Sequence, residues 1–527
     1  MEKRIIRHVP RRPAHLMSHA PRISLVIALA VLASAFPVNA TQYDTITLLF
    51  TNDMHAQDHP LPMRVGDGAV EAGGFVALSS YIHEIRGVRP DTLLLDAGDH
   101  FTGTPLCTVT EGAAVVDIMN EMGYDVAVVG NHELDFGPDV LIERVDEANY
   151  TYVSANVLRH DELFAQPYAI FDVDGVKVGV IGITTIELSD LILAQHFSGL
   201  DVKDPVGMAT YYAKTLEPHV DLTIVLSHEG VGDDAEIAQQ VPYIDVIIGG
   251  HSGGPYYSPK VVNNVLITRT KERTLSLGRI DALVDLDKNC IVRYNYQLIP
   301  TWVVGASSPI PSVEEKVERY YDDVERELDV VIGELACDLY RGYARSPATC
   351  WTADVLLEWT EQEGVPEADF AVQNNGGSRR DLAAGPVTKR DLWELSPFGN
   401  YPAMFNVTGE QLWVALENHI ARRKDRVSFS GIHYTYDSTK PKGHRLVEVT
   451  VGGEALELNR TYRGITNNFV AGHGQLYFGF DLSLTHEFPG VPIRDLEIAA
   501  FEEATSRGRR VAEGYDIRDR GLDVANG

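Results

Sequence analysis

The chain contains 527 residues, with 75 acidic and 45 basic side chains, so its formal net charge is −30 at pH 7. A chain of this length is too long to fold around one ordinary hydrophobic core, and we therefore expect two domains. The excess of negative charge argues against a nucleic-acid polymer as the partner. A small phosphate-bearing molecule would also be repelled unless cations or arginines made its binding site locally positive.

The N-terminal residues are typical of a secretory signal peptide. Basic residues extend from Lys3 to Arg22, and the apolar run Ile23–Phe36 follows them. The small residues of Val38–Ala40 form a cleavage site. We expect residues 1–40 to be removed on export, which places the mature protein in a periplasm or outside the cell. No later apolar run is long enough to span a bilayer, so we expect no stable membrane insertion of the mature chain.

The next segment alternates between short apolar stretches and amphipathic stretches. Six apolar stretches are rich in Val, Ile and Leu and are predicted to be buried strands: Thr45–Asn52, Thr92–Ala97, Asp125–Val129, Val176–Ile183, Leu222–Ser227 and Val246–Ile248. Helices are predicted between several of them, at Phe75–Arg86, Ala113–Glu121 and Pro205–Leu216. This alternation indicates a layered α/β domain whose helices cover the faces of its sheets.

Three further strands are expected to close the first domain, at Val265–Thr268, Ile280–Asp285 and Ile291–Leu298. Prolines at positions 309 and 311 then interrupt the chain, and Ser312–Val331 is a charged segment with one apolar helical stripe. We assign residues 41–308 to the first domain, 309–332 to a linker helix, and 333–527 to a second domain.

Four cysteines remain after the expected cleavage: Cys107, Cys290, Cys337 and Cys350. Export would permit a disulfide, and Cys337 with Cys350 is the best candidate pair because the two are close in sequence. Spacing alone does not establish a bond, and free buried thiols are the alternative.

Metal-binding side chains follow the predicted strands. They are Asp53, His55, Asp99, Asn131, His228 and His251. Taken singly, each has an ordinary explanation, such as a surface turn, a helix cap or a buried histidine. Together they form a hard oxygen-and-imidazole ligand set, which suits two divalent ions such as Zn, Mn, Fe or Co. A carboxylate such as Asp99 can bridge two cations that clamp one phosphoryl group, which indicates a phosphoester hydrolase.

These fragments also resemble the motifs of a known family. They are Asp53-Met54-His55, Gly98–Thr104, Gly130–Asp135, His228 and Gly250-His251-Ser252, with Asn375–Arg380, Pro397–Asn400 and Asn468–Gly472 in the second half. They resemble the calcineurin-like metallophosphoesterases, and specifically the secreted two-domain 5′-nucleotidase family, over nearly all of the mature chain. The resemblance implies a layered β-sandwich metallophosphoesterase domain flanked by helices, joined by a linker helix to a second α/β domain.

The resemblance implies two metal sites that share one carboxylate. The implied ligands are Asp53 and His55 on the first metal, Asp99 as the bridge, and Asn131, His228 and His251 on the second metal. When bound, the two cations would polarise the phosphoryl group and activate a water molecule for in-line attack.

Two roles next to the metals are also implied by the resemblance. His132 would not be a ligand but would contact the phosphoryl oxygens or the leaving group, with its ring oriented by Asp135. Asn131 would contact the substrate as well as the second metal.

The second domain is expected to bind the rest of the substrate. The resemblance implies that Asn375 and Arg380 contact it and that Phe469 stacks on a nucleobase. An arginine suits a phosphate because its planar fork binds two oxygens at once. For Phe469, packing in the domain core is the alternative explanation.

The chain departs from the family pattern at four places. Gly253 stands where the family has a side-chain metal ligand, and Thr349-Cys350 stands where it has Gly-Asn. Arg426 aligns with a second base-stacking aromatic residue, and Gln475 aligns with an acidic residue. Most positions that would read the substrate are altered, whereas most positions that would carry the chemistry are kept.

The sequence therefore predicts an exported dinuclear-metal phosphoester hydrolase, similar to 5′-nucleotidases, that releases phosphate from nucleotides or related small phosphoesters in nucleotide catabolism. Within the same family, the alternatives are a 2′,3′-cyclic-nucleotide phosphodiesterase and a UDP-sugar hydrolase. The alternative from another class is a non-catalytic protein that captures a phosphate-bearing ligand. The presence of both His132 and Asp135 favours the enzyme, because a pure binding protein needs neither.

Overall fold

The computed structural model describes residues 42–65, 68–342, 346–421, 427–515 and 520–525. The expected signal peptide, residues 1–40, and Arg426 lie outside these ranges. Within them, no helix has both the length and the apolar composition needed to cross a membrane.

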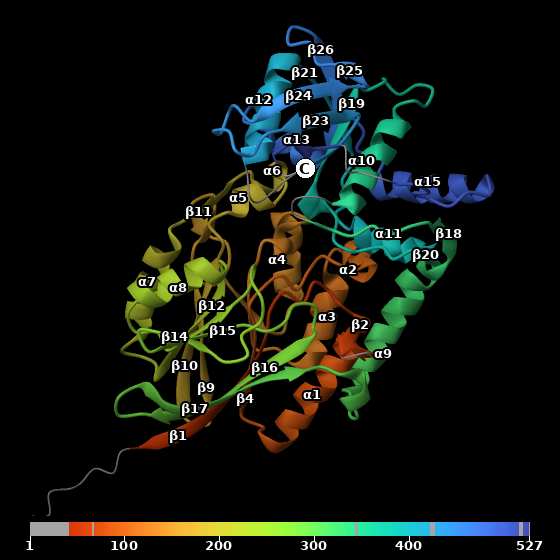
Figure 1. Ribbon diagram of the computed structural model, residues 1–527. Helices are drawn as coiled ribbons and strands as arrows, with labels where there is room; N and C mark the ends of the chain where they lie inside the picture. Colours follow the sequence, from red (N-terminus) through yellow and green to blue (C-terminus); the bar gives the residue numbers. More distant parts are fainter. Residues whose placement is uncertain (1–41, 66–67, 343–345, 422–426, 516–519, 526–527) are drawn as a thin grey trace, which may run out of the picture. The chain divides into compact units, whose positions relative to one another are not determined.

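Two six-stranded sheets form the centre of the first domain (Figure 1). One has the order β17-β16-β1-β4-β5-β6, and the other has the order β14-β15-β13-β12-β10-β9. The strands of the first sheet are β1 (Tyr43–Thr51), β4 (Thr92–Asp96), β5 (Val126–Val128), β6 (Thr151–Val153), β16 (Ser276–Asp285) and β17 (Cys290–Pro300). Those of the second are β9 (Tyr168–Val173), β10 (Val176–Thr184), β12 (Leu222–His228), β13 (Val246–Gly249), β14 (Lys260–Val262) and β15 (Val265–Thr268). All nine predicted strands are present in these two sheets, together with β6, β9 and β14, which were not predicted.

The two sheets pack face to face over an apolar core. Leu48 and Phe50 of β1 lie in this core with Val178 and Val180 of β10. Leu49, between them, belongs instead to the layer shared with the helices. Side chains alternate between the two faces of a strand, and Leu48, Leu49 and Phe50 are consecutive and buried, so both faces of this part of β1 are covered. The expected β-sandwich with flanking helices is confirmed.

Helices cover the outer face of each sheet. Three helices pack in the layer that contains Leu49: α1 (Phe75–Val88), α3 (Ala113–Met122) and α9 (Pro311–Tyr320). Two helices pack on the second sheet: α7 (Pro205–Leu216) and α8 (Val231–Gln240). Shorter elements complete the domain: α2 (Pro105–Thr110), α4 (Pro138–Glu147), α5 (Leu188–Leu191), α6 (Ala194–Phe197), the hairpin of β2 (Leu61–Val65) and β3 (Gly68–Ala72), and the small sheet of β7 (Val157–Arg159), β8 (Glu162–Leu163) and β11 (Leu200–Val202). The parallel strands β1, β4 and β5, and likewise β10, β12, β13 and β15, end at the edges where the candidate ligands lie.

The helix predicted as a linker is shorter than expected and packs on the first domain. Its α-helical part is α9, which is followed by a π-helical turn at Tyr321–Glu325 and a 3-10 turn at Arg326–Asp329. Val313 and Val317 of α9 are buried in the same core cluster as residues of α1 and α3. The apolar stripe seen in the sequence therefore attaches this helix to the first domain.

The second domain is built on a five-stranded sheet of order β22-β19-β26-β21-β27. Its strands are β19 (Phe370–Asn374), β21 (Pro402–Thr408), β22 (Val427–Ser430), β26 (Thr461–Asn467) and β27 (Ser483–Glu487). A four-stranded sheet contains β23 (Ile432–Tyr436), β24 (Leu446–Val451), β25 (Glu454–Ala455) and β28 (Leu522–Asp523), and β18 (Val331–Leu335) pairs with β20 (Gly385–Thr388). The helices are α10 (Pro347–Trp359), α11 (Lys389–Leu395), α12 (Gly409–Ala421), α13 (Asn468–Gly472), α14 (Gly474–Tyr477) and α15 (Ile493–Ser506). The expected second α/β fold is confirmed.

All four cysteines lie in the described residues, and all four are free thiols. Cys337 and Cys350, the candidate disulfide pair, are therefore not bonded to each other. Cys350 is buried in the first turns of α10, which agrees with the alternative of a free buried thiol.

Candidate metal and phosphoester site

The candidate ligands come from loops that follow strands of both sheets. Asp53 and His55 follow β1, Asp99 follows β4, Asn131 follows β5, His228 ends β12, and His251 follows β13. Asp53, His55, Asp99 and His251 all have positive φ angles, between 48° and 68°. Residues other than glycine adopt this backbone conformation at a cost, which the surrounding structure offsets, and such residues concentrate at functional sites.

The side chains form two clusters that share Asp99. In one cluster, ligand atoms of His55, Asp99 and His132 lie within 4.8 Å of one another, and in the other the same holds for Asp99, His228 and His251. Asn131 joins the second cluster, because its Oδ1 lies 3.0 Å from Nδ1 of His251. A carboxylate common to both groups is the arrangement that a bridging ligand requires.

Asp53 lies beside both clusters and is already engaged within the protein. Its Oδ1 accepts the backbone N–H of His251 at 3.0 Å, and its Oδ2 accepts the side-chain amide of Asn52 at 2.7 Å. Burial raises the pKa of Asp53 to about 7. The structure thus brings five of the six predicted ligands into close groups and places the sixth next to them.

The geometry of His228 fits a bound cation. Its Nδ1 lies 2.7 Å from the carbonyl oxygen of Ala97 and donates to it, so Nε2 of the neutral ring carries the lone pair. This Nε2 is fully buried and has no hydrogen-bond partner among the residues that the structure describes, yet it lies 3.0 Å from Oδ2 of Asp99. Two acceptors at that distance need a proton or a metal ion to hold them together. Burial alone would lower the pKa of His228, but the negative charge of Asp99 raises it to about 10.

His55 is oriented in the same way for a metal in the first cluster. Its Nδ1 lies 3.1 Å from the carbonyl oxygen of Thr102, which leaves Nε2 as the ligand atom. Burial and then the charge of Arg379 hold the pKa of His55 well below its usual range, so the ring is neutral as a ligand must be.

Both ring nitrogens of His132 have polar partners. Its Nδ1 lies 2.6 Å from Oδ2 of Asp135, and the same carboxylate oxygen accepts the hydroxyl of Thr102 at 2.7 Å. Its Nε2 accepts a hydrogen bond from Arg379 at 2.8 Å and lies 3.9 Å from Oδ2 of Asp99. Burial acts to lower the pKa of His132, but Asp135 and Asp99 together raise it. The ring is therefore close enough to act on a group bound at Asp99, and its Nε2 also lies within reach of a metal.

Two neighbouring arginines, Arg379 and Arg380, have different partners in the structure. Arg380 pairs with Glu394 and, at 3.1 Å, with Asp391, so its guanidinium is occupied by carboxylates of α11. Arg379 reaches the site instead, where it contacts His132 and lies 5.4 Å from the ring centroid of Phe398. The assignment of Arg380 to the substrate stays a prediction, while the structure places the side chain of Arg379, and not that of Arg380, against His132.

Two residues missed in the sequence support this site. Glu133 accepts backbone N–H groups from Asp99, Gly130 and Phe101 at 2.6–3.0 Å, which ties the loop after β4 to the loop after β5. Arg273 donates to the carbonyl oxygen of Arg379 at 3.0 Å and adds a second half-buried cation. The signal for Glu133 was its place in the Gly-Asn-His-Glu motif, whereas no motif pointed to Arg273.

Comparison with known proteins identifies the two halves of the chain. Residues 46–255 match the family model of calcineurin-like phosphoesterases, and residues 322–481 match that of the 5′-nucleotidase C-terminal domain. The chain belongs to the two-domain 5′-nucleotidase family. The crystal structure of a 5′-nucleotidase precursor from Thermus thermophilus superposes with a TM-score of 0.79 at 26% identity, covering 91% of this chain and 99% of that one.

Individual relatives differ in length. Protein UshA of Yersinia enterocolitica is 28% identical over 82% of this chain and 86% of its own. The trifunctional nucleotide phosphoesterase protein YfkN of Bacillus subtilis is 29% identical over 82% of this chain, but the match covers only 32% of YfkN. This chain thus spans about a third of YfkN and most of UshA.

The remaining residues expected to bind substrate in this 5′-nucleotidase family member lie in the second domain. Asn375 accepts the hydroxyl of Ser428 at 2.7 Å. Phe469 packs against the core of the second domain, with its ring centroid 4.4 Å from that of His473. These contacts agree with the core-packing alternative for Phe469.

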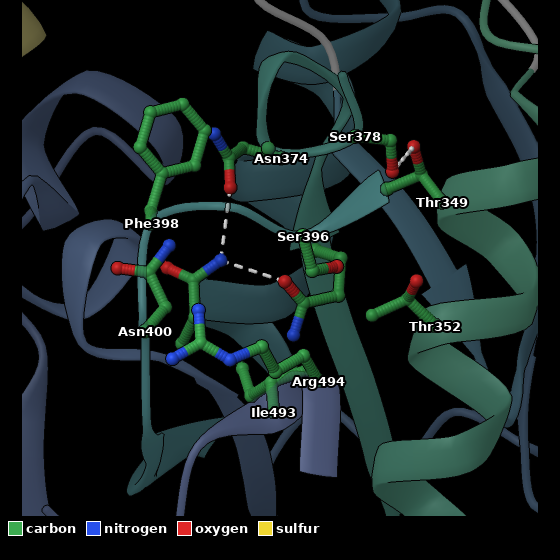
Figure 2. A pocket seen from close by; sticks show the side chains of 12 residues that line it. Thr349, Thr352, Asn374, Ser378, Ser396, Phe398, Asn400, Ile493 and Arg494 are labelled. Atoms are coloured by element: carbon green, nitrogen blue, oxygen red, sulfur yellow. Dashed lines mark hydrogen bonds between the residues drawn. The ribbon is translucent and has the colours of Figure 1, made fainter. Parts of the chain in front are cut away.

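A pocket lies in the second domain, and most of the residues that line it carry polar side chains, among them Asn374, Ser378, Ser396 and Asn467 (Figure 2). Figure 2 shows Phe398 and Asn400 on one side of it, Thr349 and Thr352 on the other, and Arg494 below. Phe398 also stacks on the ring of His132, with centroids 5.8 Å apart and planes 23° apart. One aromatic side chain thus connects this pocket with the candidate catalytic histidine.

Thr349, one of the positions that depart from the family pattern, has a structural role in this pocket. Its hydroxyl forms hydrogen bonds with the hydroxyls of Ser346 and Ser378, at 2.7 and 3.0 Å. Ser346 is the N-cap of α10, so the altered residue stabilises the start of this helix.

Proposed function

We propose that this protein is a metal-dependent phosphoester hydrolase that releases phosphate from nucleotides or related small phosphoesters. The observation that carries the proposal is the position of His132 between Asp135 and Arg379, beside two ligand clusters that share Asp99. The family assignment supports the same reaction class.

The proposal includes two divalent ions, each of Zn, Mn, Fe or Co type, because the donor set combines imidazole with hard oxygen atoms. The residues that would hold them are Asp53, His55 and Asp99 on one side and Asp99, Asn131, His228 and His251 on the other. When bound, such ions polarise a phosphoryl group and lower the pKa of water.

His132 then supplies the proton that the leaving group needs. Asp135 fixes the ring and favours its protonated form, so Nε2–H can donate to the ester oxygen as the P–O bond breaks. The attacking water molecule restores this proton, and the products are an alcohol and inorganic phosphate. In the structure, Arg379 donates to Nε2 of His132; with substrate present, we expect its guanidinium to turn to the phosphoryl oxygens.

The test of this function is release of inorganic phosphate from a panel of substrates. The panel contains the common nucleoside 5′-monophosphates, a 2′,3′-cyclic nucleotide, a UDP-sugar and a base-free sugar phosphate, each measured with added divalent metal and with chelator. We expect turnover that disappears in chelator and returns with metal. Ligand binding without turnover, at every metal tested, would support the phosphate-binding alternative instead.

The same panel measures base selectivity, which we predict to be weak. Gln475 replaces the acidic residue of the family pattern, and an amide accepts from sugar hydroxyls less strongly than a carboxylate. Phe469 is half-buried and packs against the domain core, which reduces the ring area that could stack on a base. We expect kcat/KM for the four bases to agree within about 10³-fold, since more than about 4 kcal/mol of base-specific contacts would be needed to exceed that ratio. A stronger preference for one base would contradict this prediction.

Arg379 and Arg380 provide a matched pair of variants. Arg379→Gln should lower kcat/KM by about 10- to 100-fold, because a charge-assisted hydrogen bond contributes about 1.5–3 kcal/mol. Arg380→Gln removes the neighbouring arginine, whose ion pairs face α11, and should change kcat/KM by less than about threefold. Steady-state kinetics on one nucleotide measure both effects, and a larger loss in Arg380→Gln than in Arg379→Gln would support Arg380 as the substrate ligand.

A further inference from the structure

Among the described residues that line the pocket of the second domain, only Arg494 is charged. This arginine lies in the first turn of α15 and is half-buried. Its Nε and Nη1 atoms are buried and have no hydrogen-bond partner in the described residues, and no carboxylate among those residues forms an ion pair with it. A guanidinium keeps its charge and its donors inside a protein, so this side chain lacks an acceptor that its surroundings do not supply.

An aromatic ring supports the guanidinium without using its donors. Cζ of Arg494 lies 3.6 Å from the ring centroid of Trp393, which belongs to α11. A cation over an aromatic face is stabilised by the ring, and its N–H groups stay available for hydrogen bonds. The N-terminus of α15 adds partial positive charge at the same place, and its N-cap, Pro492, forms no side-chain cap bond. Figure 2 shows the Arg494 side chain below Asn400 in the pocket.

One backbone contact determines how the neighbouring amide groups are oriented. Oδ1 of Asn467 accepts the backbone N–H of Val470 at 2.7 Å, so Nδ2 of Asn467 is the donor on the other side. This Nδ2 donates to Oε1 of Gln373 at 2.6 Å and to Oδ1 of Asn374 at 2.9 Å. These contacts use the amide oxygens of Gln373 and Asn374, and each side chain keeps an NH₂ group that Asn467 does not use.

The lining therefore has more donors than acceptors to offer. Nε2 of Gln373 is buried without a hydrogen-bond partner in the described residues, and the residue is only 4% exposed. The hydroxyls of Thr352 and Ser396 donate to Oε1 of Glu497 at 2.6 and 3.1 Å, so they point their hydrogens away from any ligand. Buried polar atoms are almost always paired in folded proteins. A group that only accepts would pair these donors, and the charge of Arg494 favours one that is negative.

Phe398 connects the pocket with the phosphoester site. It lines the pocket and also stacks on the ring of His132. Ser378 lines the pocket as well, and the next residue, Arg379, donates to His132 at 2.8 Å. A substrate whose phosphoryl group lies beside His132 can therefore reach the pocket past a single aromatic side chain.

We propose that this pocket binds a second acidic group of the substrate, a carboxylate or a phosphate, through Arg494 and the amide nitrogen of Gln373. The inference rests on the proposed hydrolysis of small phosphoesters. It adds that the chain prefers esters that carry a further negative charge away from the phosphoryl group that is released. Recognition of charge also accords with weak selectivity for the base, because these contacts do not depend on the shape of a base.

The test compares phosphoesters that differ in one acidic group. Orotidine 5′-monophosphate has a carboxylate on the base that uridine 5′-monophosphate lacks, and adenosine 3′,5′-bisphosphate has a phosphate on the sugar that adenosine 5′-monophosphate lacks. Chromatography of the nucleoside products measures loss of the 5′-phosphate. We expect the more acidic member of at least one pair to have a kcat/KM about 10- to 100-fold higher, the usual contribution of a charge-assisted hydrogen bond. The difference should lie mainly in KM, because the contact is the same before and during the reaction.

Two variants and a control assign this preference to the pocket. Arg494→Gln removes the charge, and Gln373→Glu keeps the oxygen that accepts from Asn467 but puts a carboxylate oxygen in place of the unpartnered nitrogen. Both variants should reduce the preference to less than about threefold. Arg507→Gln changes an arginine at the other end of α15, one that is 58% exposed and paired with Glu503, and should leave the preference unchanged.

The outcomes separate this inference from the proposed function. The preference is a ratio measured within one variant, so a loss of stability does not change it, and turnover of uridine 5′-monophosphate shows that the variant is folded. No turnover of any substrate would contradict the proposed function, whereas equal turnover within both pairs would overturn only this inference. A preference that persists in Arg494→Gln would overturn it too. Calorimetric binding of sulfate that depends on Arg494, without a preference among substrates, would assign the pocket to a free anion instead.

Discussion

Replacing Asp99 with alanine is expected to remove metal from both clusters and to abolish measurable turnover. Its carboxylate is the one group common to the cluster of His55 and His132 and the cluster of His228 and His251. The loss should reach about 10⁴-fold or more in kcat/KM, because metal polarisation contributes several kcal/mol to the transition state. Elemental analysis of the purified variant, together with phosphate release, measures both effects.

Comparison with ligands of a single cluster sharpens this prediction. His55→Ala and His251→Ala should each reduce metal content mainly at one site, whereas Asp99→Ala should reduce it at both. Asp91→Ala, at an exposed acidic residue just before the same strand, is the matched control and should retain metal and activity. If Asp99→Ala kept full activity in chelator, the assignment of this site would be wrong.

Replacing His132 with asparagine is expected to lower kcat by about 10²- to 10⁴-fold, the usual contribution of a positioned acid or base. Metal content and substrate affinity should stay near those of the unmodified chain, because the residue acts on the transition state. The structure makes this test necessary, since the His132 ring also lies within ligand distance of His55 and Asp99. Loss of one metal ion in the variant would show that His132 is a ligand.

Asp135 allows an independent check on the same role. Asp135→Asn keeps the shape of the side chain but removes the charge that raises the pKa of His132. If His132 is the proton donor, the activity of this variant should decline at a lower pH than that of the unmodified chain, because a less basic ring loses its proton earlier. An unchanged pH profile would argue that Asp135 only supports the loop through Thr102.

The sequence by itself was enough to predict the strands of the first domain and to group the candidate ligands. Buried strands are apolar on both faces, so their runs of Val, Ile and Leu were visible without any structure. Parallel strands end at the same edge of a sheet, and the polar residues after β1, β4, β5, β12 and β13 could therefore be grouped in advance. The spacing of Asp53, His55, Asp99, His228 and His251 needed no further information to predict a metal site.

Only the tertiary structure showed which side chains outside the sequence motifs point toward the metal site. Arg379 and Arg380 are chemically identical neighbours, and their directions depend on Asp391 and Glu394, which come from a different element. Sequence patterns do not show such partners, because they record spacing along one segment and not the packing of two segments against each other.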